Sequence, residues 1–585
     1  MFDLMNVEKP ARYTGGEFNE IVKDHEKMLS SYAFCFPDTY EVGMSHLGMR
    51  ILYHVINNRD KTVCERVFAP WIDMEEQMRS HKIPLFSLET KKPVSEFDIV
   101  GFTLQYEMSY TNVLNMLDLS NIPIRREDRN ETHPIIMAGG PCSVNPETLY
   151  DIMDIFIIGE AEEVINEVLD LFELMKKDNS SRNDFLRKVN DIEGVYVPLF
   201  HNLKKKIKRR IIKDLDKVSF PTDSIVPYIN IIHDRASLEL FRGCIRGCRF
   251  CQAGFIYRPV REKKAQTLID QTKDILDKTG YDEIGMVSLS TSDYSDLKTL
   301  CDGMLEHTEK RMVNLSVPSM RIDNFSIDLM KRIQKVRKSG LTFAPEAGSQ
   351  RLRDVINKNL TEEEILNSVK IARDGGYDNI KLYFMLGLPT ETDEDVLAIA
   401  ELGKKILEIF GRKRRINITI STSFFIPKPF TPFQWCAQIT KQEMVRRQRL
   451  LRDSIKEKKI KYNWHDFNTS IVESAISRGD RLTGKAIIRA WEKGCKFDSW
   501  NEFFDMDKWV SAFSECGLDI YQQASREINS NDILPWDHID IGVTKKFLKN
   551  EYKKAFDEIT TKNCREECTG CGIAKYKCGV CFENN

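Results

Sequence analysis

Two stretches of the chain alternate short apolar runs with longer amphipathic ones, and this alternation restricts the possible folds more than any other feature. In the first stretch, residues 1–176, five runs have the length and composition of buried strands: SYAFCF (31–36), CERVFAP (64–70), FDIVGFTL (97–104), PIIMAGG (134–140) and DIFIIGE (154–160). Helical spacing separates these runs. Such alternation predicts a parallel sheet with helices on both faces, and a ligand crevice at the carboxyl ends of the strands.

The second stretch, residues 231–440, repeats the pattern. Its strand candidates are SLELF (237–241), EIGMVSL (283–289), VNLSV (313–317), GLTFA (340–344), NIKLYFML (379–386) and INITISTSFF (416–425). Six strand–helix units predict a parallel barrel that stays open, because a closed barrel of this kind has eight. We therefore expect an α/β protein with a partial (β/α)6 barrel whose chemistry lies at the carboxyl rim of the strands.

Two further segments complete the chain. Residues 177–230 are predicted to be a linker, and they include the basic run NLKKKIKRRIIKD (202–214). That run could contact a phosphate backbone, although a solvated edge strand or linker is the commoner identity of such a segment. Residues 441–585 are polar and rich in helix formers, which predicts a mainly helical C-terminal region with a cysteine-rich tail.

The charge balance argues against nucleic-acid binding through bulk charge. The chain has 86 Lys and Arg against 88 Asp and Glu, a formal net charge of -2, although a local basic groove is still compatible with these numbers. No apolar run has the length of a membrane span, and the first residues lack a secretory or transit pattern. Composition therefore predicts a soluble cytoplasmic protein that does not enter a membrane.

Eight of the fifteen cysteines fall into two tight groups. The first group is Cys244, Cys248 and Cys251; the second is Cys564, Cys568, Cys571, Cys578 and Cys581. A reducing cytosol makes structural disulfides rare, and clustered thiols there usually hold metal. The other seven cysteines are spaced singly and are expected to be buried small residues.

The first cysteine group directly follows the predicted strand 237–241, which places it at the rim of the barrel. Three thiolates spaced Cys-x3-Cys-x2-Cys can coordinate three irons of a cubane cluster and leave the fourth iron open. A structural zinc site has four ligands, and the loop contains no histidine to supply the fourth. Arg246 and Arg249 can offset part of the thiolate charge.

This triplet, with Phe250 before its last cysteine and a partial barrel after it, resembles the radical S-adenosylmethionine (SAM) superfamily. The resemblance implies a [4Fe-4S] cluster on Cys244, Cys248 and Cys251 whose open iron binds SAM, with Phe250 beside the cofactor. It also implies reductive cleavage of SAM to methionine and a 5′-deoxyadenosyl radical, with electrons from a donor such as flavodoxin or ferredoxin.

Four later segments resemble the SAM-binding motifs of that superfamily. SLSTSD (288–293) stands where the family contacts the SAM amino group, but serines replace the usual Gly-Gly-Glu, so Ser290 and Ser292 are the predicted contacts. SVPSMRID (316–323) resembles the ribose and carboxylate region, MLGLPTETDED (385–395) the adenine region, and FAPEAG (343–348) the segment whose glutamate accepts hydrogen bonds from SAM. The implied SAM contacts in two of these segments are Ser319, Arg321 and Glu346.

A Rossmann-like domain directly before such a barrel resembles the cobalamin-binding branch of the superfamily. FRGCIRGCRFCQAG, FIPKPFTPFQW (425–435), RAWEKGCKFDSW and LPWDHIDIG further resemble one uncharacterised subfamily of that branch over the full length. Gly139 and Gly140 could let a corrin ring approach a strand end, or they could be simple turn residues. No histidine has the Asp-x-His-x-x-G context; His46 comes nearest but lacks the Asp, so a corrin is expected to bind without an axial histidine.

The tail offers five thiols within 18 residues. A second iron–sulfur cluster and a structural zinc ion are both possible occupants of these thiols, and the Arg and Lys residues of the tail could contact RNA.

The leading hypothesis for the whole chain is a radical SAM enzyme that performs cobalamin-dependent methyl transfer or related radical chemistry. The alternatives are an RNA- or ribosome-associated metal protein, motivated by residues 202–214 and GRKRR (411–415), and a radical SAM enzyme that modifies RNA without cobalamin. RNA or protein is the predicted substrate class.

Overall fold

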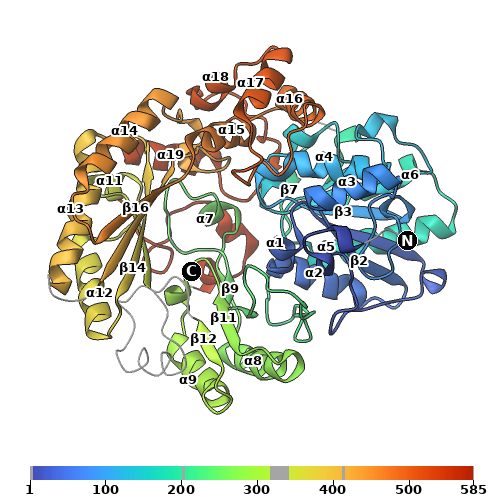
Figure 1. Cartoon of the computed structure of the whole chain (residues 1–585), viewed down its shortest axis with the longest axis horizontal. Helices are drawn as coiled ribbons and strands as arrows, with labels where there is room; N and C mark the ends of the chain where they lie inside the picture. Colours follow the sequence, from blue (N-terminus) through green and yellow to red (C-terminus); the bar gives the residue numbers. More distant parts are fainter. Residues whose placement is uncertain (1–3, 201–204, 317–340, 412–415, 584–585) are drawn as a thin grey trace.

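A computed structural model describes residues 4–200, 205–316, 341–411 and 416–583. Two regions built on parallel sheets lie side by side, and the helices of residues 467–525 lie along the top of the view in Figure 1. The strands in both regions fall close to the apolar runs of the sequence. The predicted α/β fold class with a Rossmann-like domain and a partial barrel is confirmed.

The N-terminal region contains one sheet of six strands in the order β2-β1-β3-β4-β5-β6. Its strands are β1 (Ser30–Phe36), β2 (Thr62–Phe68), β3 (Ile99–Thr103), β4 (Ile135–Gly139), β5 (Ile155–Ile157) and β6 (Val195–Tyr196). Only the short β6, which the sequence did not predict, runs antiparallel to its neighbour. Every residue of β1 and β2 is buried, because helices cover both faces of the sheet.

The two faces of this sheet have separate apolar cores. One core joins Ala33 and Val100 to helices α3 (Ile72–His81) and α4 (Tyr110–Leu119). The other joins Phe34 and Ile99 to α2 (Leu47–Asn57) and α5 (Ala161–Lys177). Because successive strand residues point to opposite faces, the continuous apolar runs of the sequence supply both cores.

The barrel region consists of two sheets. In each sheet all strands are parallel, and they lie side by side in the order in which they occur in the sequence. The first sheet contains β8 (Ala236–Glu239), β11 (Glu283–Val287) and β12 (Asn314–Ser316); the second contains β13 (Leu341–Glu346), β14 (Asn379–Leu386), β15 (Asn417–Phe424) and β16 (Ile460–Trp464). Along β14 and β15 burial alternates residue by residue, so one face packs on helices and the other faces the inside of the open barrel. Strand β16 lies in the segment that the sequence predicted to be mainly helical.

Helices α8 (Ala265–Thr279), α9 (Leu297–Thr308), α12 (Glu362–Asp374), α13 (Asp393–Phe410) and α14 (Lys441–Ser454) connect these strands or follow them. The start of α12 shows why such a helix forms where it does. The Thr361 hydroxyl accepts the Glu364 N–H at 3.2 Å, and the Glu364 carboxylate accepts the Thr361 N–H at 2.7 Å. This capping box satisfies two N–H groups that the first helical turn leaves free.

The C-terminal helices tie the two regions together. They are α15 (Phe467–Ser477), α16 (Arg481–Glu492), α17 (Met506–Glu515) and α18 (Ile520–Ser525). The loop between α16 and α17 meets the carboxyl edge of the N-terminal sheet, where the Trp500 indole donates to Asp38 at 3.1 Å and Thr111 donates to Asp498 at 2.6 Å. Across the described ranges, none of the helices combines the length and apolar character needed to cross a membrane.

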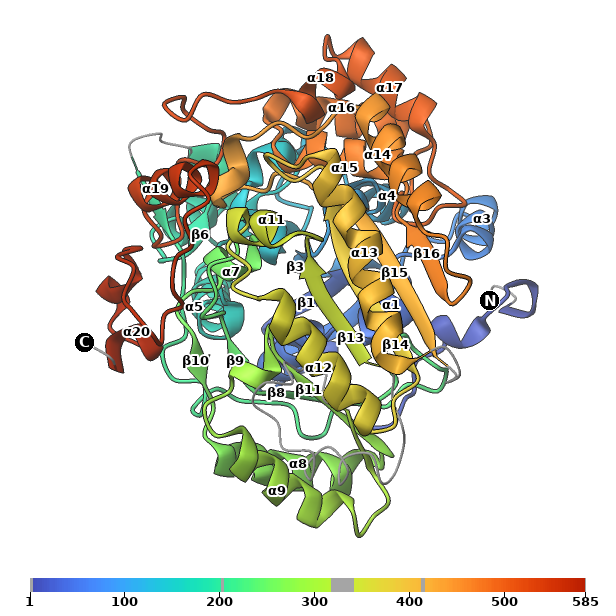
Figure 2. The same ribbon diagram turned by 90° about the vertical axis from the view of Figure 1, so that its left-hand side faces the viewer.

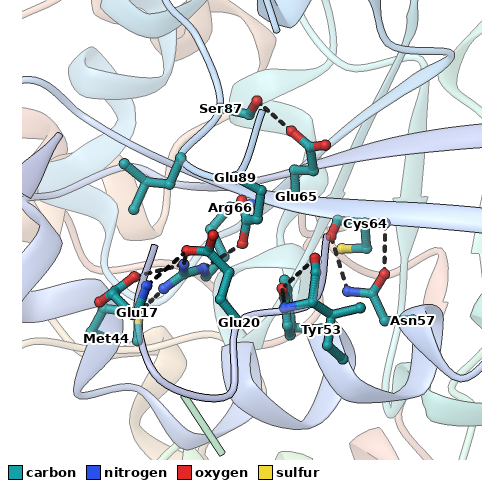
Figure 3. Close-up of polar contacts among 12 residues, drawn as sticks. Glu17, Glu20, Met44, Tyr53, Asn57, Cys64, Glu65, Arg66, Ser87 and Glu89 are labelled. Carbon is teal, nitrogen blue, oxygen red and sulfur yellow. Dashed lines mark hydrogen bonds and ion pairs between the residues drawn. The ribbon is translucent and has the colours of Figure 1, made fainter. Parts of the chain in front are cut away.

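A buried charged cluster lies at the edge of the N-terminal sheet (Figure 3). Arg66, on β2, forms ion pairs with Glu17 at 2.7 Å, Glu20 at 2.9 Å and Glu89 at 2.7 Å. Only 1% of Arg66 is exposed. The guanidinium thus holds two separate segments, that of Glu17 and Glu20 and that of Glu89, against β2.

Candidate functional site

The first cysteine group occupies a loop at the carboxyl end of the first barrel strand, as the sequence predicted. The loop begins after β9 (Phe241–Arg242) and leads into the short helix α7 (Ala253–Ile256), after which β10 (Arg261–Glu262) returns antiparallel to β9. Gly243 has a φ of +89°, and a Cβ there would lie 2.5 Å from the Pro259 carbonyl oxygen. Only glycine allows this close fold of the loop.

Each of the two outer thiols of the loop is harder to deprotonate because of burial and the neighbouring cysteines. Burial, and then the charge of the Cys248 thiolate, raise the pKa of Cys244 to about 12 and that of Cys251 to about 11. Backbone N–H groups oppose this: the Arg246 N–H donates to the Cys244 sulfur at 3.4 Å, and the Gly254 N–H acts on Cys251. Without metal these thiols therefore hold their protons, and coordination to a cation would remove them.

The donor set fits an iron–sulfur cluster. Within the residues that the structure describes, no three Cys, His, Asp or Glu side chains converge on the position of one metal ion. The cysteines of a cubane bind three different irons, so their sulfurs surround the cluster and do not meet at one point. Three soft thiol ligands with N–H groups directed at two of them suit that arrangement.

The loop after the second barrel strand lies against the cysteine loop. Arg246 donates to the Asp293 carboxylate at 3.0 Å, and Ser290 donates to the same carboxylate at 2.7 Å. The Ser292 hydroxyl is buried and makes no hydrogen bond within the described part of the chain. The structure thus brings both predicted serines to the cysteine loop, and one of them has an unused hydroxyl.

The end of β13 reaches the cysteine loop from the other side. Burial raises the pKa of Glu346, while Lys358, whose Nζ lies 3.4 Å from its Oε1, opposes the shift. Both charges act on Cys251, and Glu346 has a left-handed φ of 67°. A non-glycine residue in this backbone region marks a place where surrounding structure enforces an unfavourable geometry.

Two residues of this neighbourhood, Asn357 and Lys358, carry no signal in the sequence. Asn357 donates to the Gly247 carbonyl at 3.1 Å and accepts the Thr561 N–H at 2.7 Å, so it connects the cysteine loop to the C-terminal segment. Phe250 packs against the apolar cluster that contains Leu352 and Val355. Only three-dimensional proximity identifies Asn357 and Lys358, because Asn and Lys at helix ends are common in any sequence.

Arg246 and Arg249, expected to offset part of the thiolate charge, lie close enough to act electrostatically on Cys248, and each also pairs with a carboxylate. Arg246 pairs with Asp293, and the fully buried Arg249 pairs with Glu551 of α19 (Lys545–Phe556) at 3.1 Å. These pairs anchor the loop to two other parts of the chain.

Some predicted residues lie outside the described ranges. They are Ser319 and Arg321, together with residues 202–204 and 412–415 of the two basic runs. Within the described part of the first run, Arg209 is 3% exposed and Arg210 pairs with Glu163 and Glu167. Both arginines are therefore engaged within the fold.

The carboxyl edge of the N-terminal sheet presents Gly139, Gly140, Gln105 and His46, all partly exposed. A Cβ on Gly140 would lie 2.7 Å from the Leu104 carbonyl oxygen, so this glycine packs against a neighbouring loop; a Cβ on Gly139 would have its nearest neighbour at 3.8 Å. Burial lowers the pKa of His46 to about 4, and its Nδ1 accepts the Met49 N–H at 3.2 Å. The remaining proton is therefore on Nε2, which leaves no free lone pair for a metal.

The cysteine-rich tail packs directly on the first cysteine loop, which the sequence did not indicate. The Cys564 N–H donates to the Ile245 carbonyl at 3.1 Å, and the Val580 N–H donates to the Val260 carbonyl at 3.1 Å. Arg565 also pairs with Glu262 of β10. In Figure 2 the tail, ending in α20 (Val580–Glu583), lies beside β10 and β9.

The chain matches two family models. Residues 238–403 match the radical SAM superfamily, and residues 48–198 match the N-terminal domain of radical SAM proteins.

Two curated relatives come from Methanocaldococcus jannaschii. An uncharacterised protein is 28% identical over 84% of this chain and 98% of its own length. A protein named as a methylthiotransferase is 28% identical over 27% of this chain and 37% of its own length. Among solved structures, the radical SAM methyltransferase TsrM from Kitasatospora setae, with cobalamin and a [4Fe-4S] cluster bound, aligns with a TM-score of 0.47 and 12% identity over 69% of this chain and 76% of that one.

Proposed function

The chain belongs to the radical SAM superfamily and is an enzyme, and we propose that it cleaves SAM reductively at a [4Fe-4S] cluster held by Cys244, Cys248 and Cys251. The observation that supports this most is the loop itself, which holds three neighbouring cysteines at the carboxyl end of the first barrel strand, two of them with backbone N–H groups directed at their sulfurs. When bound, the cluster and SAM supply the electron transfer that breaks a carbon–sulfur bond of the sulfonium.

The chain's own residues would position SAM around this loop. The hydroxyls of Ser290 and Ser292 would accept hydrogen bonds from the amino group, and the half-buried Glu346 would accept from the ribose or amino group. The Arg246–Asp293 pair holds the serine loop against the cysteine loop. Ser319 and Arg321 remain predicted contacts.

We propose methyl transfer to an unactivated carbon or phosphorus centre as the reaction, with cobalamin as the methyl carrier. The name of the methylthiotransferase relative supports the transfer of a methyl-bearing group. For the corrin, Gly139, Gly140 and Gln105 would offer backbone and amide groups, and the protonated Nε2 of His46 fits a ring held without an axial histidine. Flavodoxin or ferredoxin stays the proposed electron donor, and RNA or protein the proposed substrate class.

The central test is SAM turnover after anaerobic reconstitution with iron and sulfide. With a strong reductant, the wild-type chain should release 5′-deoxyadenosine, and Cys248→Ala should reduce the release to background. The matched control is Cys516→Ala. Cys516 is partly exposed and belongs to neither cysteine group, so this variant should keep wild-type turnover. A wild-type chain that binds iron but does not turn over SAM would contradict the proposal.

The corrin site has a separate test in the absorbance of bound hydroxocobalamin. A Cβ at Gly139 would meet no atom closer than 3.8 Å, so Gly139→Leu should fold normally. The leucine side chain would then occupy the space beside the carboxyl end of β4, where the corrin is proposed to bind. We expect this variant to lose cobalamin binding and keep its iron content. Wild-type cobalamin binding by Gly139→Leu would rule out this edge of the sheet as the site.

A further inference from the structure

The inner face of the second barrel sheet has a row of basic and hydroxyl side chains that the proposed function does not use. Strand register places Lys381 of β14 beside Thr419 of β15, and Thr419 beside Lys461 of β16. Their neighbours along the strands, such as Leu382 and Ile420, belong to the apolar core that α12, α13 and α14 cover. Because successive strand residues point to opposite faces, the two lysines and the threonine face the inside of the open barrel.

Neither lysine of this row has a carboxylate partner. Lys461 is exposed and Lys381 is half-buried, and in the described part of the chain no ion pair involves either of them. The Lys381 Nζ lies 4.7 Å from the centre of the Tyr383 ring, which is 39% exposed. An aromatic ring carries no net charge, so this contact leaves the positive charge of the lysine unbalanced.

The rest of the inner surface does not supply the missing negative charge. The apolar residues of β8 and β11 pack against α8 and α9, so the residues that alternate with them face the inside of the barrel. Three carboxylates lie on the inner faces of the two sheets or at their rim, and each already has a basic partner: Glu239 with Arg242 at 2.8 Å, Glu283 with Arg235 at 2.9 Å, and Glu346 with Lys358 at 3.4 Å. The charge inside the barrel therefore favours an anionic ligand.

The row has the composition of a site for one phosphate group. Strands two positions apart in a sheet are separated by about 10 Å, so the flexible side chains of Lys381 and Lys461 can both reach a group placed over Thr419. A phosphate monoester has a charge of about −2 at neutral pH and three acceptor oxygens, which matches two ammonium groups and one hydroxyl. A carboxylate, with a single charge and two oxygens, would leave one of the two cations unbalanced.

We propose that Lys381, Thr419 and Lys461 bind a phosphate monoester of the substrate and thereby orient the substrate toward SAM. Phe384, which is in register with Glu346, lies three residues beyond Lys381 and therefore about 10 Å nearer the carboxyl rim of the barrel. The proposal rests on the proposed function, because it places the substrate in the same barrel. It specifies the chemistry of that substrate: a phosphate monoester, either of a small organic phosphate or of a 5′-phosphorylated RNA end.

Labelling with pyridoxal 5′-phosphate tests the site without SAM turnover. The aldehyde condenses with a lysine amine and releases water, borohydride reduces the imine to a stable amine, and peptide mass spectrometry locates the label. In the folded full-length chain we expect pyridoxal 5′-phosphate to label Lys381 or Lys461 about tenfold more than pyridoxal, which lacks the phosphate. Excess inorganic phosphate should abolish this preference. Lys461→Gln should abolish it at Lys381, and Lys381→Gln should abolish it at Lys461, because the second lysine holds the phosphate.

The matched controls are Lys456 and Lys458, which are exposed just before β16 and form no ion pair in the described ranges. Both reagents should label these two lysines equally. The double variant Lys456→Gln/Lys458→Gln removes as much charge as Lys381→Gln/Lys461→Gln, but it should keep the preference at the row.

Equal labelling of Lys381 and Lys461 by the two reagents, in a chain whose circular dichroism shows that it is folded, would overturn the proposal. An equally large preference at Lys456 or Lys458 would also overturn it, since phosphate would then be attracted to basic surface in general. Competition by ribose 5-phosphate would support a small substrate, and competition by 5′-phosphorylated RNA alone would support an RNA end. Equal competition by RNA without a 5′-phosphate would overturn the assignment to a monoester. Because SAM turnover is not measured, failure of this proposal is distinguishable from failure of the proposed function.

Discussion

Arg66 and Arg258 are both buried guanidinium groups, but their surroundings differ in kind. Arg66, in the N-terminal region, has three carboxylates within 2.9 Å (Figure 3). Arg258, between the two cysteine groups, has two backbone carbonyls and nearby thiols. The chain itself supplies the counter-charge in the first region, whereas the second region acquires it only when its thiols are deprotonated. We therefore expect the N-terminal region to be stable without metal and the cysteine region to depend on it.

The largest effect is expected from Arg66→Met. This change leaves the buried carboxylates of Glu17, Glu20 and Glu89 without a cation, which should lower the local free energy of opening by about 3–5 kcal/mol. Hydrogen exchange of peptides that cover β1 and β2 measures this free energy. The decrease should be the same with and without iron. A decrease that appears only in the iron-loaded protein would show that the N-terminal region also depends on metal, which contradicts the contrast between Arg66 and Arg258.

Arg258→Met should behave in the opposite way. In the iron-loaded protein the change removes a charged partner of the sulfurs, so protection of residues 244–262 against hydrogen exchange should fall by about 2–3 kcal/mol. In the iron-free protein the buried cation has no anionic partner, so its removal should cost little or even stabilise the fold. Equal losses in both forms would show that Arg258 is an ordinary structural residue.

Glu89→Gln addresses the pH dependence of the Arg66 cluster. Burial raises the pKa of Glu89 from its ordinary 4.5 to about 7, with Arg66 opposing the shift. The stability that this group contributes is present below pH 4.5 and is lost as the pH rises through 7. In Glu89→Gln the free energy of local opening should vary less with pH, by on the order of 1–2 kcal/mol between pH 5 and pH 8 in the same hydrogen-exchange measurement. An unchanged pH dependence would show that a group other than Glu89 causes it.

The smallest effect is expected from Glu262→Gln, which removes the ion pair with Arg565. The Arg565 side chain is 32% exposed, and ion pairs near solvent contribute less than about 1 kcal/mol. Protection of the tail should therefore change little, because backbone contacts such as Cys564–Ile245 hold it. Detachment of the tail in this variant would show that charge, not backbone packing, docks it.

The sequence predicts the strands well where they are apolar and long. The five runs of the N-terminal region and the six of the barrel all contain strands, because each strand is buried on at least one face. Strand β16 escaped prediction because its sequence, IKYNW, is short and half polar. It exists because the edge of β15 offers it a hydrogen-bonding partner.

The site is only partly readable from the sequence. The cysteine spacing identified the triplet, and the serine loop and Glu346 do lie beside it. The docking of the tail, the link through Asn357 and the burial of Arg258 depend on contacts between residues far apart in the chain. A single sequence contains no local pattern for such contacts, since a guanidinium in the run YRPV is equally compatible with a solvated surface.

The distance along the chain between the cysteine loop and its cover affects synthesis. Glu262 and Arg565, which meet in the finished fold, are 303 positions apart. At roughly 5–20 residues per second, a ribosome needs on the order of 15–60 s to make the intervening residues. During that interval the cysteine loop lacks the contacts that the tail makes in the finished fold, so its three sulfurs are more accessible to iron and to oxygen than they are in the complete chain.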